Sequence, residues 1–379
     1  MTTERARALL AEHPLIDGHN DLPFELRRLV SYDLGRYDVG VRQDRTHTDL
    51  VRLAEGGVGG QFWSVFTEAG PDGERAVAET LEQIDAVHAL VARYPDRLAL
   101  ATTADEVEKA QASGRIASLI GAEGGHSIGS SLGVLRMLFA LGVRYMTLTH
   151  NFNVPWADSA TDDERIGGLD DFGRSVVREM NRIGMLADLS HVSPGTMRDT
   201  LATTSAPVIF SHSSARALCD HPRNVPDDVL AQLPANGGLC MVTFVPAFVS
   251  QEVCDWEAGL RDDLERRGFD IRISAEDPAD EKRTVAEYAA HTPLPVATIA
   301  QVADHVEHVR DVAGAAHVGI GGDFDGCDPM PAGLGDVSCY PALIAELIGR
   351  GWSDADLAAL TRGNVLRVLR GAEATAAAT

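Results

Sequence analysis

The chain carries a histidine and a carboxylate two positions apart, His19 and Asp21, closely after the apolar pair Leu15-Ile16. In a β-strand, residues i and i+2 point to the same side, so the imidazole and the carboxylate can converge on one point. Nitrogen and oxygen ligands of this kind bind divalent metals such as zinc. Because His-x-Asp also occurs by chance in many chains, the pair alone does not establish a metal site.

Five further residues of the ligand type each end or closely follow a strand-like apolar run: Glu123, His150, His191, His212 and Asp323. Each has a structural alternative, since a histidine at a strand end is commonly a hydrogen-bonded structural residue. Glu123 could equally be a solvated turn residue, and Asp323 could cap the following loop. Chance would have to place all of them at the same end of their strands, so together they favour a metal site with a bridging glutamate.

Short apolar runs alternate with longer helical patterns along the chain. We expect strands at Leu15–His19, Gly60–Phe66, Ile116–Ala122, Tyr145–His150, Met185–His191, Val208–His212, Leu239–Phe244 and Val318–Asp323. We expect helices at Gly73–Tyr94, Leu132–Leu141, Asp171–Ile183, Pro194–Thr203, Val296–Val312, Tyr340–Gly349 and Asp354–Leu369. This alternation predicts a closed (β/α)8 barrel of the TIM type. An open doubly wound sheet is disfavoured because no glycine-rich phosphate loop follows an early strand.

Two stretches interrupt this pattern, the polar Ser31–Asp49 and the charge-rich Val249–Thr292. In a barrel they would be excursions after the first and seventh strands, near the face where active sites lie. Neither an internal repeat nor a linker-like composition is evident, so we expect a single barrel domain over residues 1–379. The tail at residues 370–379, rich in Ala and Thr, is predicted to be frayed.

Composition restricts the partners and the compartment. With 33 basic and 56 acidic residues, the formal net charge of −23 disfavours binding to nucleic acid or to anionic lipid. Five cysteines without a C-x-x-C pattern favour free thiols in a reducing cytoplasm. The early charges at Met1–Arg7 and the lack of an 18-residue apolar stretch argue against a signal peptide and a membrane span. We therefore expect a cytoplasmic protein.

These motifs resemble those of peptidase family M19, the renal or membrane dipeptidases. The matching stretches occur in the family's order over nearly the whole chain: Ile16-Asp17-Gly18-His19-Asn20-Asp21, Glu123-Gly124, Leu148-Thr149-His150-Asn151, Asp188-Leu189-Ser190-His191, Phe210-Ser211-His212-Ser213, His221-Pro222-Arg223-Asn224 and Gly322-Asp323-Phe324-Asp325-Gly326. The resemblance implies a distorted, metallo-dependent hydrolase-like (β/α)8 barrel that is usually a homodimer. It also implies dipeptide substrates, often with tolerance for a D-residue at the C-terminal position.

Residue by residue, the resemblance implies two zinc ions per chain. His19 and Asp21 would bind one zinc, His191 and His212 the other, and Glu123 would bridge both. A hydroxide between the two metals would be the nucleophile. His150, Arg223 and Asp323 would contact the substrate, with Asp323 as the proton-transfer residue. The Arg223 fork suits a dipeptide's free carboxylate, although a surface salt bridge is an alternative for this arginine.

The chain also departs from the family pattern. Membrane-anchored relatives carry a signal peptide and a lipid-anchor signal, and we see neither, so the chain resembles a soluble bacterial branch. Relatives often place a tyrosine near the substrate after the seventh strand, where this chain has the run Met241–Pro246.

The main alternative is another amidohydrolase-type barrel metallohydrolase, which would act on a cyclic amide or a related C–N bond. Such enzymes usually open with His-x-His and often use a carbamylated lysine, whereas Lys109 and Lys282 do not lie at predicted strand ends. The other alternative is a metal-binding barrel that has lost its chemistry. It would lack a ligand or Asp323, and none is missing.

Overall fold

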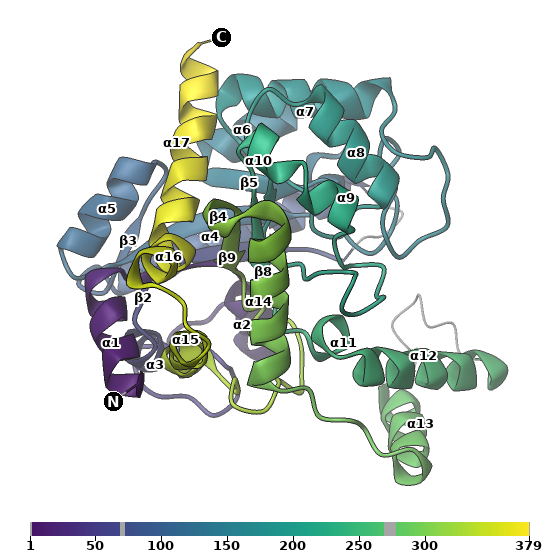
Figure 1. Cartoon of the computed structure of the whole chain (residues 1–379). Coiled ribbons are helices and arrows are strands. Elements are labelled where there is room, and N and C mark those ends of the chain that lie inside the picture. The colour runs from purple at the N-terminus through teal and green to yellow at the C-terminus, as the bar shows by residue number, and fades with distance from the viewer. Residues whose placement is uncertain (1, 69–72, 269–277, 379) are drawn as a thin grey trace.

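The computed structural model describes residues 2–68, 73–268 and 278–378, and Figure 1 shows its helices and strands. Eight strands in this part of the chain pair in parallel, in sequence order. They are β1 (Leu15–Asn20), β2 (Val58–Phe66), β4 (Ile116–Glu123), β5 (Val143–Thr147), β6 (Leu186–Asp188), β7 (Ile209–Phe210), β8 (Leu239–Val242) and β9 (Val318–Ile320). A further short strand, β3 (Leu98–Leu100), pairs with β4 outside this order and was not predicted.

The sheet curves into a nearly closed barrel because the chain after β9 returns to the end of β1. Asn20 and Phe324 form a parallel bridge, and the backbone N–H of Asp21 donates to the Phe324 carbonyl at 2.9 Å. The backbone N–H of Asp323 donates to the His19 carbonyl at 3.3 Å. The predicted (β/α)8 barrel is therefore confirmed. The end of β1 and the segment after β9 lie side by side at its mouth.

All eight predicted barrel strands exist, but several are shorter than predicted. β5, β6 and β7 end at Thr147, Asp188 and Phe210, so the histidines predicted to end them lie in the loops that follow. The apolar runs continue past the last paired residue because these loops are themselves buried, and burial rather than strand pairing selects their apolar residues.

Helices alternate with the strands around the barrel. They include α4 (Gly73–Arg93), α5 (Ala104–Ala112), α6 (Leu132–Ala140), α7 (Asp171–Ile183), α8 (Pro194–Thr203), α14 (Ile299–Ala313) and α15 (Tyr340–Gly349). The predicted bounds of α7, α8 and α15 are confirmed. α8 begins where the Ser193 hydroxyl accepts from the backbone N–H of Thr196, with Pro194 as the first helical residue, which is a favourable N-terminal cap.

Several helices were not predicted, because most are short and depend on packing against the barrel. They are α1 (Thr2–Glu12), α2 (Leu22–Val30), α3 (Leu50–Glu55), α5, α9 (Asp227–Leu230) and α10 (Leu233–Asn236), with 3-10 turns at Gly125–Ile128, Ala315–His317 and Val337–Cys339. The helix predicted at Asp354–Leu369 is divided by a π-helical turn (Ala359–Gly363) into α16 (Asp354–Ala358) and α17 (Asn364–Ala377).

The prediction of a frayed tail at residues 370–379 is wrong, since α17 remains helical to Ala377. Leu369 and Ala372 are buried in a cluster that includes Ile16 and Tyr145 from the barrel strands. The Glu373 carboxylate accepts from the backbone N–H of Ala104 at 2.8 Å, at the start of α5. Ala372 therefore belongs to a packed face of the helix, and the alanine-rich composition of this segment is not a sign of disorder.

The two predicted excursions differ in their structure. The stretch Ser31–Asp49 contains no helix or strand. Within its described residues the second stretch, which begins at the end of α11 (Pro246–Val249), is largely helical, with α12 (Gln251–Arg266) and α13 (Pro278–His291). These two helices project from one side of the barrel (Figure 1), and residues 269–277 of the stretch lie outside the described residues.

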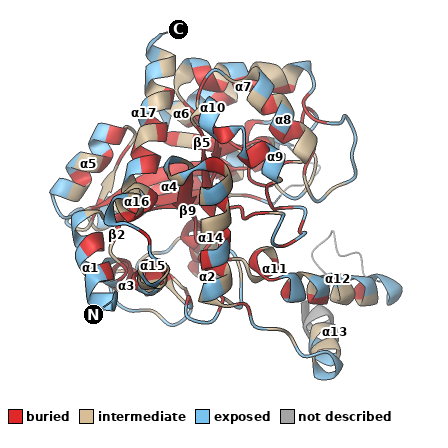
Figure 2. Cartoon of the chain, viewed as in Figure 1, coloured by how far each residue is buried: buried red, intermediate tan, exposed pale blue. Residues whose placement is uncertain are grey.

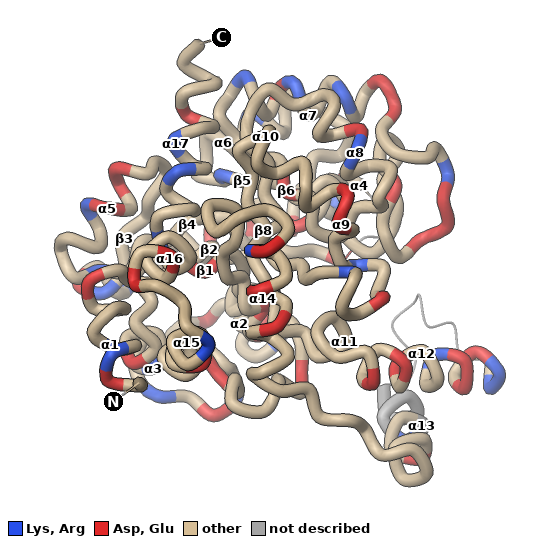
Figure 3. Tube along the Cα trace, viewed as in Figure 1, with Lys and Arg blue, Asp and Glu red and all other residues tan. Residues whose placement is uncertain are grey.

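Buried residues concentrate on the strands and on the inner faces of the helices (Figure 2). Acidic and basic residues lie mostly on the outer helices and loops (Figure 3). None of the helices in the described ranges is both long and apolar enough to cross a membrane.

Candidate active site

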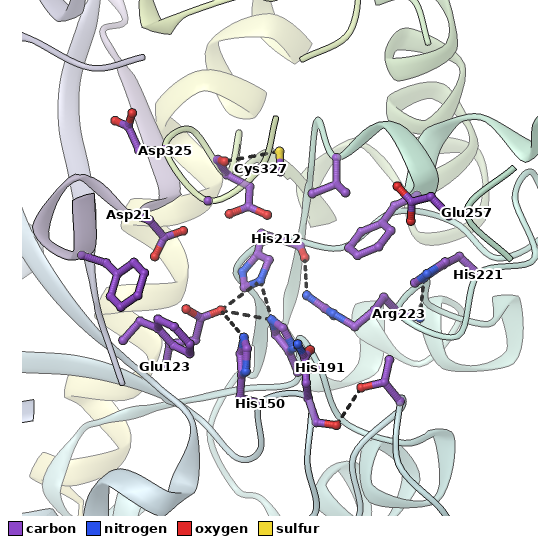
Figure 4. A pocket seen from close by; sticks show the side chains of 18 of the residues that line it. Asp21, Glu123, His150, His191, His212, His221, Arg223, Glu257, Asp325 and Cys327 are labelled. Atoms are coloured by element: carbon purple, nitrogen blue, oxygen red, sulfur yellow. Dashed lines mark hydrogen bonds and ion pairs between the residues drawn. The ribbon is translucent and has the colours of Figure 1, made fainter. Parts of the chain in front are cut away.

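The loops after the strands bring the predicted site residues to one end of the barrel. Seven of them line a cavity of about 700 Å3: Asp21, Glu123, His150, His191, His212, Arg223 and Asp323. The eighth, His19, is fully buried, and its Nε2 lies 3.3 Å from Asp21 Oδ2. All eight predicted residues therefore lie together, and Figure 4 shows several of them around the carboxylate of Glu123.

Glu123, the last residue of β4, lies at the centre of this group. Its Oε1 is 3.0 Å from His191 Nε2 and 3.4 Å from His212 Nε2. Its Oε2 is 3.5 Å from His19 Nε2 and accepts a hydrogen bond from the Ser64 hydroxyl at 3.1 Å. The two oxygens of one carboxylate thus face two different sets of possible metal ligands.

The donor atoms form overlapping clusters with the spacing that metal ions require. Atoms of His19, Asp21 and Asp323 lie within 4.8 Å of one another, as do those of His19, Glu123 and His212 and those of Glu123, His150 and His191. His191 Nε2 and His212 Nε2 are 3.0 Å apart. Imidazole nitrogens and carboxylate oxygens in this number suit zinc.

The orientation of the histidine rings supports metal binding at these clusters. The Nδ1 atoms contact oxygen atoms: Tyr145 Oη at 2.9 Å for His19, Asn151 Oδ1 at 3.2 Å for His191 and Ser211 Oγ at 2.8 Å for His212. Each Nε2 therefore faces Glu123. His19 Nε2 and Asp21 Oδ1 are buried and have no hydrogen-bond partner among the described residues. Such converging, unpartnered acceptors are stable together when they coordinate a cation, so these residues fit a divalent metal.

Burial determines the charge states of the site. It lowers the pKa values of His191 and His212 well below their ordinary value, so both imidazoles are neutral, the form that coordinates metals. Burial opposes ionisation of Glu123, but His19 and His191 outweigh it and hold its pKa well below the usual range. Burial, with the charge of Asp21, raises the pKa of Asp323 well above its usual value.

Two of the site residues have a strained backbone. His191 has φ 68° and Asp323 has φ 60°, in the left-handed region that non-glycine residues rarely adopt. Gly326 makes room for the carboxylates of Asp21 and Asp323, because a Cβ at that position would collide with Asp21 Oδ2 and Asp323 Oδ1. Strain of this kind concentrates at functional sites, where the surrounding structure holds it in place.

Arg223 is a buried cation at the wall of the cavity. The residue is 3% exposed, and its guanidinium contacts Ser213 Oγ and the His212 carbonyl, both at 3.5 Å. The guanidinium carbon lies 5.2 Å from the centre of the Phe248 ring. Burial lowers its pKa to about 10. Since it has no ion pair among the described residues, the surface salt bridge considered as an alternative does not exist there, and the group is available to an anion.

His150 lies beside the clusters. Its Nε2 is 3.9 Å from Glu123 Oε1, and its ring packs against Phe66 and His191, with centroids 4.5 and 4.2 Å away. Burial lowers its pKa to about 4, so it is neutral at pH 7.

The opposite walls of the cavity come from α2, with Phe24, Glu25 and Arg28, and from α12, with Trp256, Glu257, Leu260, Arg261 and Leu264. At the position where a tyrosine was expected after the seventh strand, Val245 and Phe248 line the cavity.

Sequence reasoning missed the buried groups that hold the ligands. Asp17 accepts from the backbone N–H groups of His19 and Gly322, at 2.8 and 2.9 Å, and from the Tyr340 hydroxyl. Asp188 accepts from the hydroxyls of Thr147 and Ser211, both at 2.6 Å. The available signal was an aspartate inside an apolar, strand-like run, which is costly unless hydrogen bonds satisfy it.

Comparison with known proteins places this geometry in a wider context. The family model "Membrane dipeptidase (Peptidase family M19)" matches residues 3–379. Dipeptidase verJ of Clonostachys rogersoniana is 45% identical over 382 residues, covering 97% of this chain and 87% of that protein. Dipeptidase 3 of Mus musculus is 42% identical over 376 residues, covering 98% of this chain and 66% of that protein, so this chain spans about two thirds of its length.

Solved structures show the same fold. A metallopeptidase from Rhodobacter sphaeroides, liganded with a phosphinate mimic of the dipeptide L-Ala-D-Ala, has a TM-score of 0.75 to this chain at 25% sequence identity. The match covers 95% of this chain and 99% of that one.

Proposed function

The chain belongs to the membrane dipeptidase family, peptidase family M19, and on this premise we propose that it is a binuclear zinc dipeptidase. The observation that carries the proposal is the position of Glu123, whose two oxygens face His19 on one side and His191 with His212 on the other. His19 and Asp21 would hold one zinc, His191 and His212 the other, and Glu123 would be shared.

Zinc bound at this centre would lower the pKa of a water molecule toward about 7 and polarise the substrate carbonyl. Asp323 lines the cavity beside the clusters, with Oδ1 3.9 Å from His19 Nε2. From this position it can take a proton from the attacking water and pass it to the leaving amine. His150 can donate a hydrogen bond to the carbonyl oxygen as negative charge develops there.

Arg223 accounts for the restriction to dipeptides. Its buried guanidinium, which forms no ion pair with the described residues, can form two parallel hydrogen bonds to a carboxylate. A dipeptide has its free carboxylate one residue beyond the scissile bond, whereas in a longer peptide the next amide would stand there. Arg223 would therefore bind the substrate's C-terminal carboxylate at a fixed distance from the metal site.

We also propose tolerance for a D-residue at the C-terminal position. Support comes from the related Rhodobacter sphaeroides enzyme, whose ligand mimics L-Ala-D-Ala. A homodimer, a single domain over the chain and a cytoplasmic location remain proposals. The family resemblance supports the first two, and the five free cysteines support the last. Light scattering on the purified protein tests the dimer.

The function is tested by hydrolysis of L,L and L,D dipeptides by the purified protein, before and after removal of metal with a chelator and after addition of zinc. We expect activity on dipeptides that the chelator abolishes and zinc restores, with tripeptides resistant. Activity on cyclic amides but not on dipeptides would instead support the amidohydrolase-type alternative. Zinc binding without either activity would support a barrel that has lost its chemistry.

A further inference from the structure

We infer that the hydroxyl groups of Tyr145 and Ser211 act as positioning groups, each fixing the tautomer of one metal-binding histidine, and that each serves a different one of the two metals. Tyr145 would serve the metal held by His19, and Ser211 the metal held by His212. The inference rests on the proposed function for the identity of the metal, and it concerns residues that carry no role in the mechanism above.

Tyr145 reaches His19 from β5, which β2 and β4 separate from β1 in the order of the sheet. It is fully buried on β5, and its hydroxyl donates to the Gly18 carbonyl at 3.2 Å. The same oxygen lies 2.9 Å from His19 Nδ1. A phenol has one proton to donate. Since that proton is used on Gly18, the phenol oxygen accepts from Nδ1–H, and His19 Nε2 is left as an acceptor for a metal.

Ser211 plays the same part for His212 through a buried relay. Its hydroxyl donates to Asp188 Oδ2 at 2.6 Å, a short charge-assisted bond, and its oxygen lies 2.8 Å from His212 Nδ1. The hydroxyl proton is therefore committed to the carboxylate, and Ser211 accepts from Nδ1–H. Asp188 cannot rotate away, because it also accepts from the Thr147 hydroxyl and from the backbone N–H groups of Ser190 and Ser211.

The two groups are independent of each other. The Tyr145 contact leads to Gly18 on β1, whereas the Ser211 contact leads to Asp188 on β6. The third histidine, His191, is held differently, by the amide oxygen of Asn151 at 3.2 Å. Partners that orient a metal-binding histidine typically change metal affinity by about 10–100-fold when they are removed. Loss of one hydroxyl should therefore weaken one metal and spare the other.

The experiment compares Tyr145→Phe and Ser211→Ala with matched controls. Tyr340→Phe also removes a buried tyrosine hydroxyl, one that donates to Asp17 and not to a histidine. Thr147→Val removes the other hydroxyl bond to Asp188 Oδ2, of the same 2.6 Å length, without touching a histidine. Two readouts are used: the histidine tautomers of metal-free protein, from long-range proton–nitrogen-15 NMR, and zinc retention against a graded chelator, measured by elemental analysis.

At a pH at which both imidazoles are neutral, we expect His19 and His212 of the metal-free wild type to carry their proton on Nδ1. In metal-free protein, Tyr145→Phe should move His19 toward a mixture of tautomers. In the chelator titration, this variant should release one zinc at about 10–100-fold lower chelator concentration, and the His19 resonances should be the first to return to their metal-free positions. Ser211→Ala should do the same at His212. Both controls should keep the wild-type tautomers and both zinc ions.

Unchanged tautomers and unchanged zinc retention in Tyr145→Phe and Ser211→Ala would overturn the inference. Equal zinc loss in the controls would also overturn it, because general loosening of the barrel would then explain the effect. A wild type that binds no zinc would instead contradict the proposed function, and the tautomer measurement on metal-free protein would still decide the inference.

Discussion

At the scale of single residues, the site includes buried atoms without a hydrogen-bond partner, and a buried cation without an ion pair, among the described residues. His19 Nε2 and Asp21 Oδ1 are buried without a hydrogen bond, and Arg223 is a buried cation without an ion pair among the described residues. Burying such groups costs several kcal/mol in general, so their persistence points to ligands that complete them. Cations suit the first two groups, and a carboxylate suits Arg223.

Asp323→Asn tests the assignment of the proton-transfer residue. The amide keeps the shape of the side chain but cannot accept and return a proton, so kcat should fall by about 10²–10⁴-fold, or about 3–5 kcal/mol of barrier. Zinc content should stay near that of the wild type. Measuring both on one preparation decides the matter: zinc lost along with activity would make Asp323 a ligand, and an active, zinc-loaded variant would refute the role.

Arg223→Lys tests carboxylate recognition. Lysine keeps the positive charge but loses the planar fork, so kcat/KM for dipeptides should fall. Amidating the C-terminus of the dipeptide should reduce kcat/KM much more for the wild type than for the variant, because only the wild type has the paired bonds to lose. An equal response of the two enzymes to amidation would show that another group reads the carboxylate.

At the scale of elements, the sequence predicts those strands and helices that a short, local hydrophobic pattern marks. Each barrel strand is an apolar run, and seven of the site residues end or closely follow such runs, so this pattern indicated them. Arg223 follows no strand and was identified only through the family resemblance. The groups that orient the ligands could not be found this way. Tyr145 is 126 positions from His19 in sequence, and only the barrel brings them together. Likewise α2 and α3 are too short for periodicity to reveal, since burial against β2 stabilises them.

The tail provides a test of this limit, because composition alone suggested disorder where the structure has a packed helix. Ala372 is 1% exposed, whereas Ala374, two positions later on the same helix, is exposed. Ala372→Asp would place an unpaired charge in the packed face and should reduce the free energy of unfolding by about 3–5 kcal/mol. Ala374→Asp should change it by no more than about 0.5 kcal/mol. Denaturant titration of both variants checks this, and equal stability would mean that the tail is not packed.

At the scale of the whole molecule, the site lies where the first barrel strand, β1, meets the segment after the last one, β9. Asp17 on β1 receives the backbone N–H of Gly322 after β9, and the N–H of Asp323 donates to the His19 carbonyl. The barrel closes through these hydrogen bonds, and the same segments supply His19, Asp21 and Asp323. Metal binding at the mouth should therefore stabilise the closed barrel, in addition to its role in catalysis.

Removal of metal should consequently lower the stability of the folded chain. A ligand that binds only the folded state adds about 2.7 kcal/mol to the free energy of unfolding when its free concentration is 100 times Kd. We expect elemental analysis to give close to two zinc ions per wild-type chain, and chelation to lower the unfolding midpoint reversibly. Glu123→Gln weakens the one ligand that both metals share, so it should bind less zinc and gain less stability from added zinc. A wild type that saturates at one zinc, together with a Glu123→Gln variant that keeps all its metal and activity, would contradict the bridged pair.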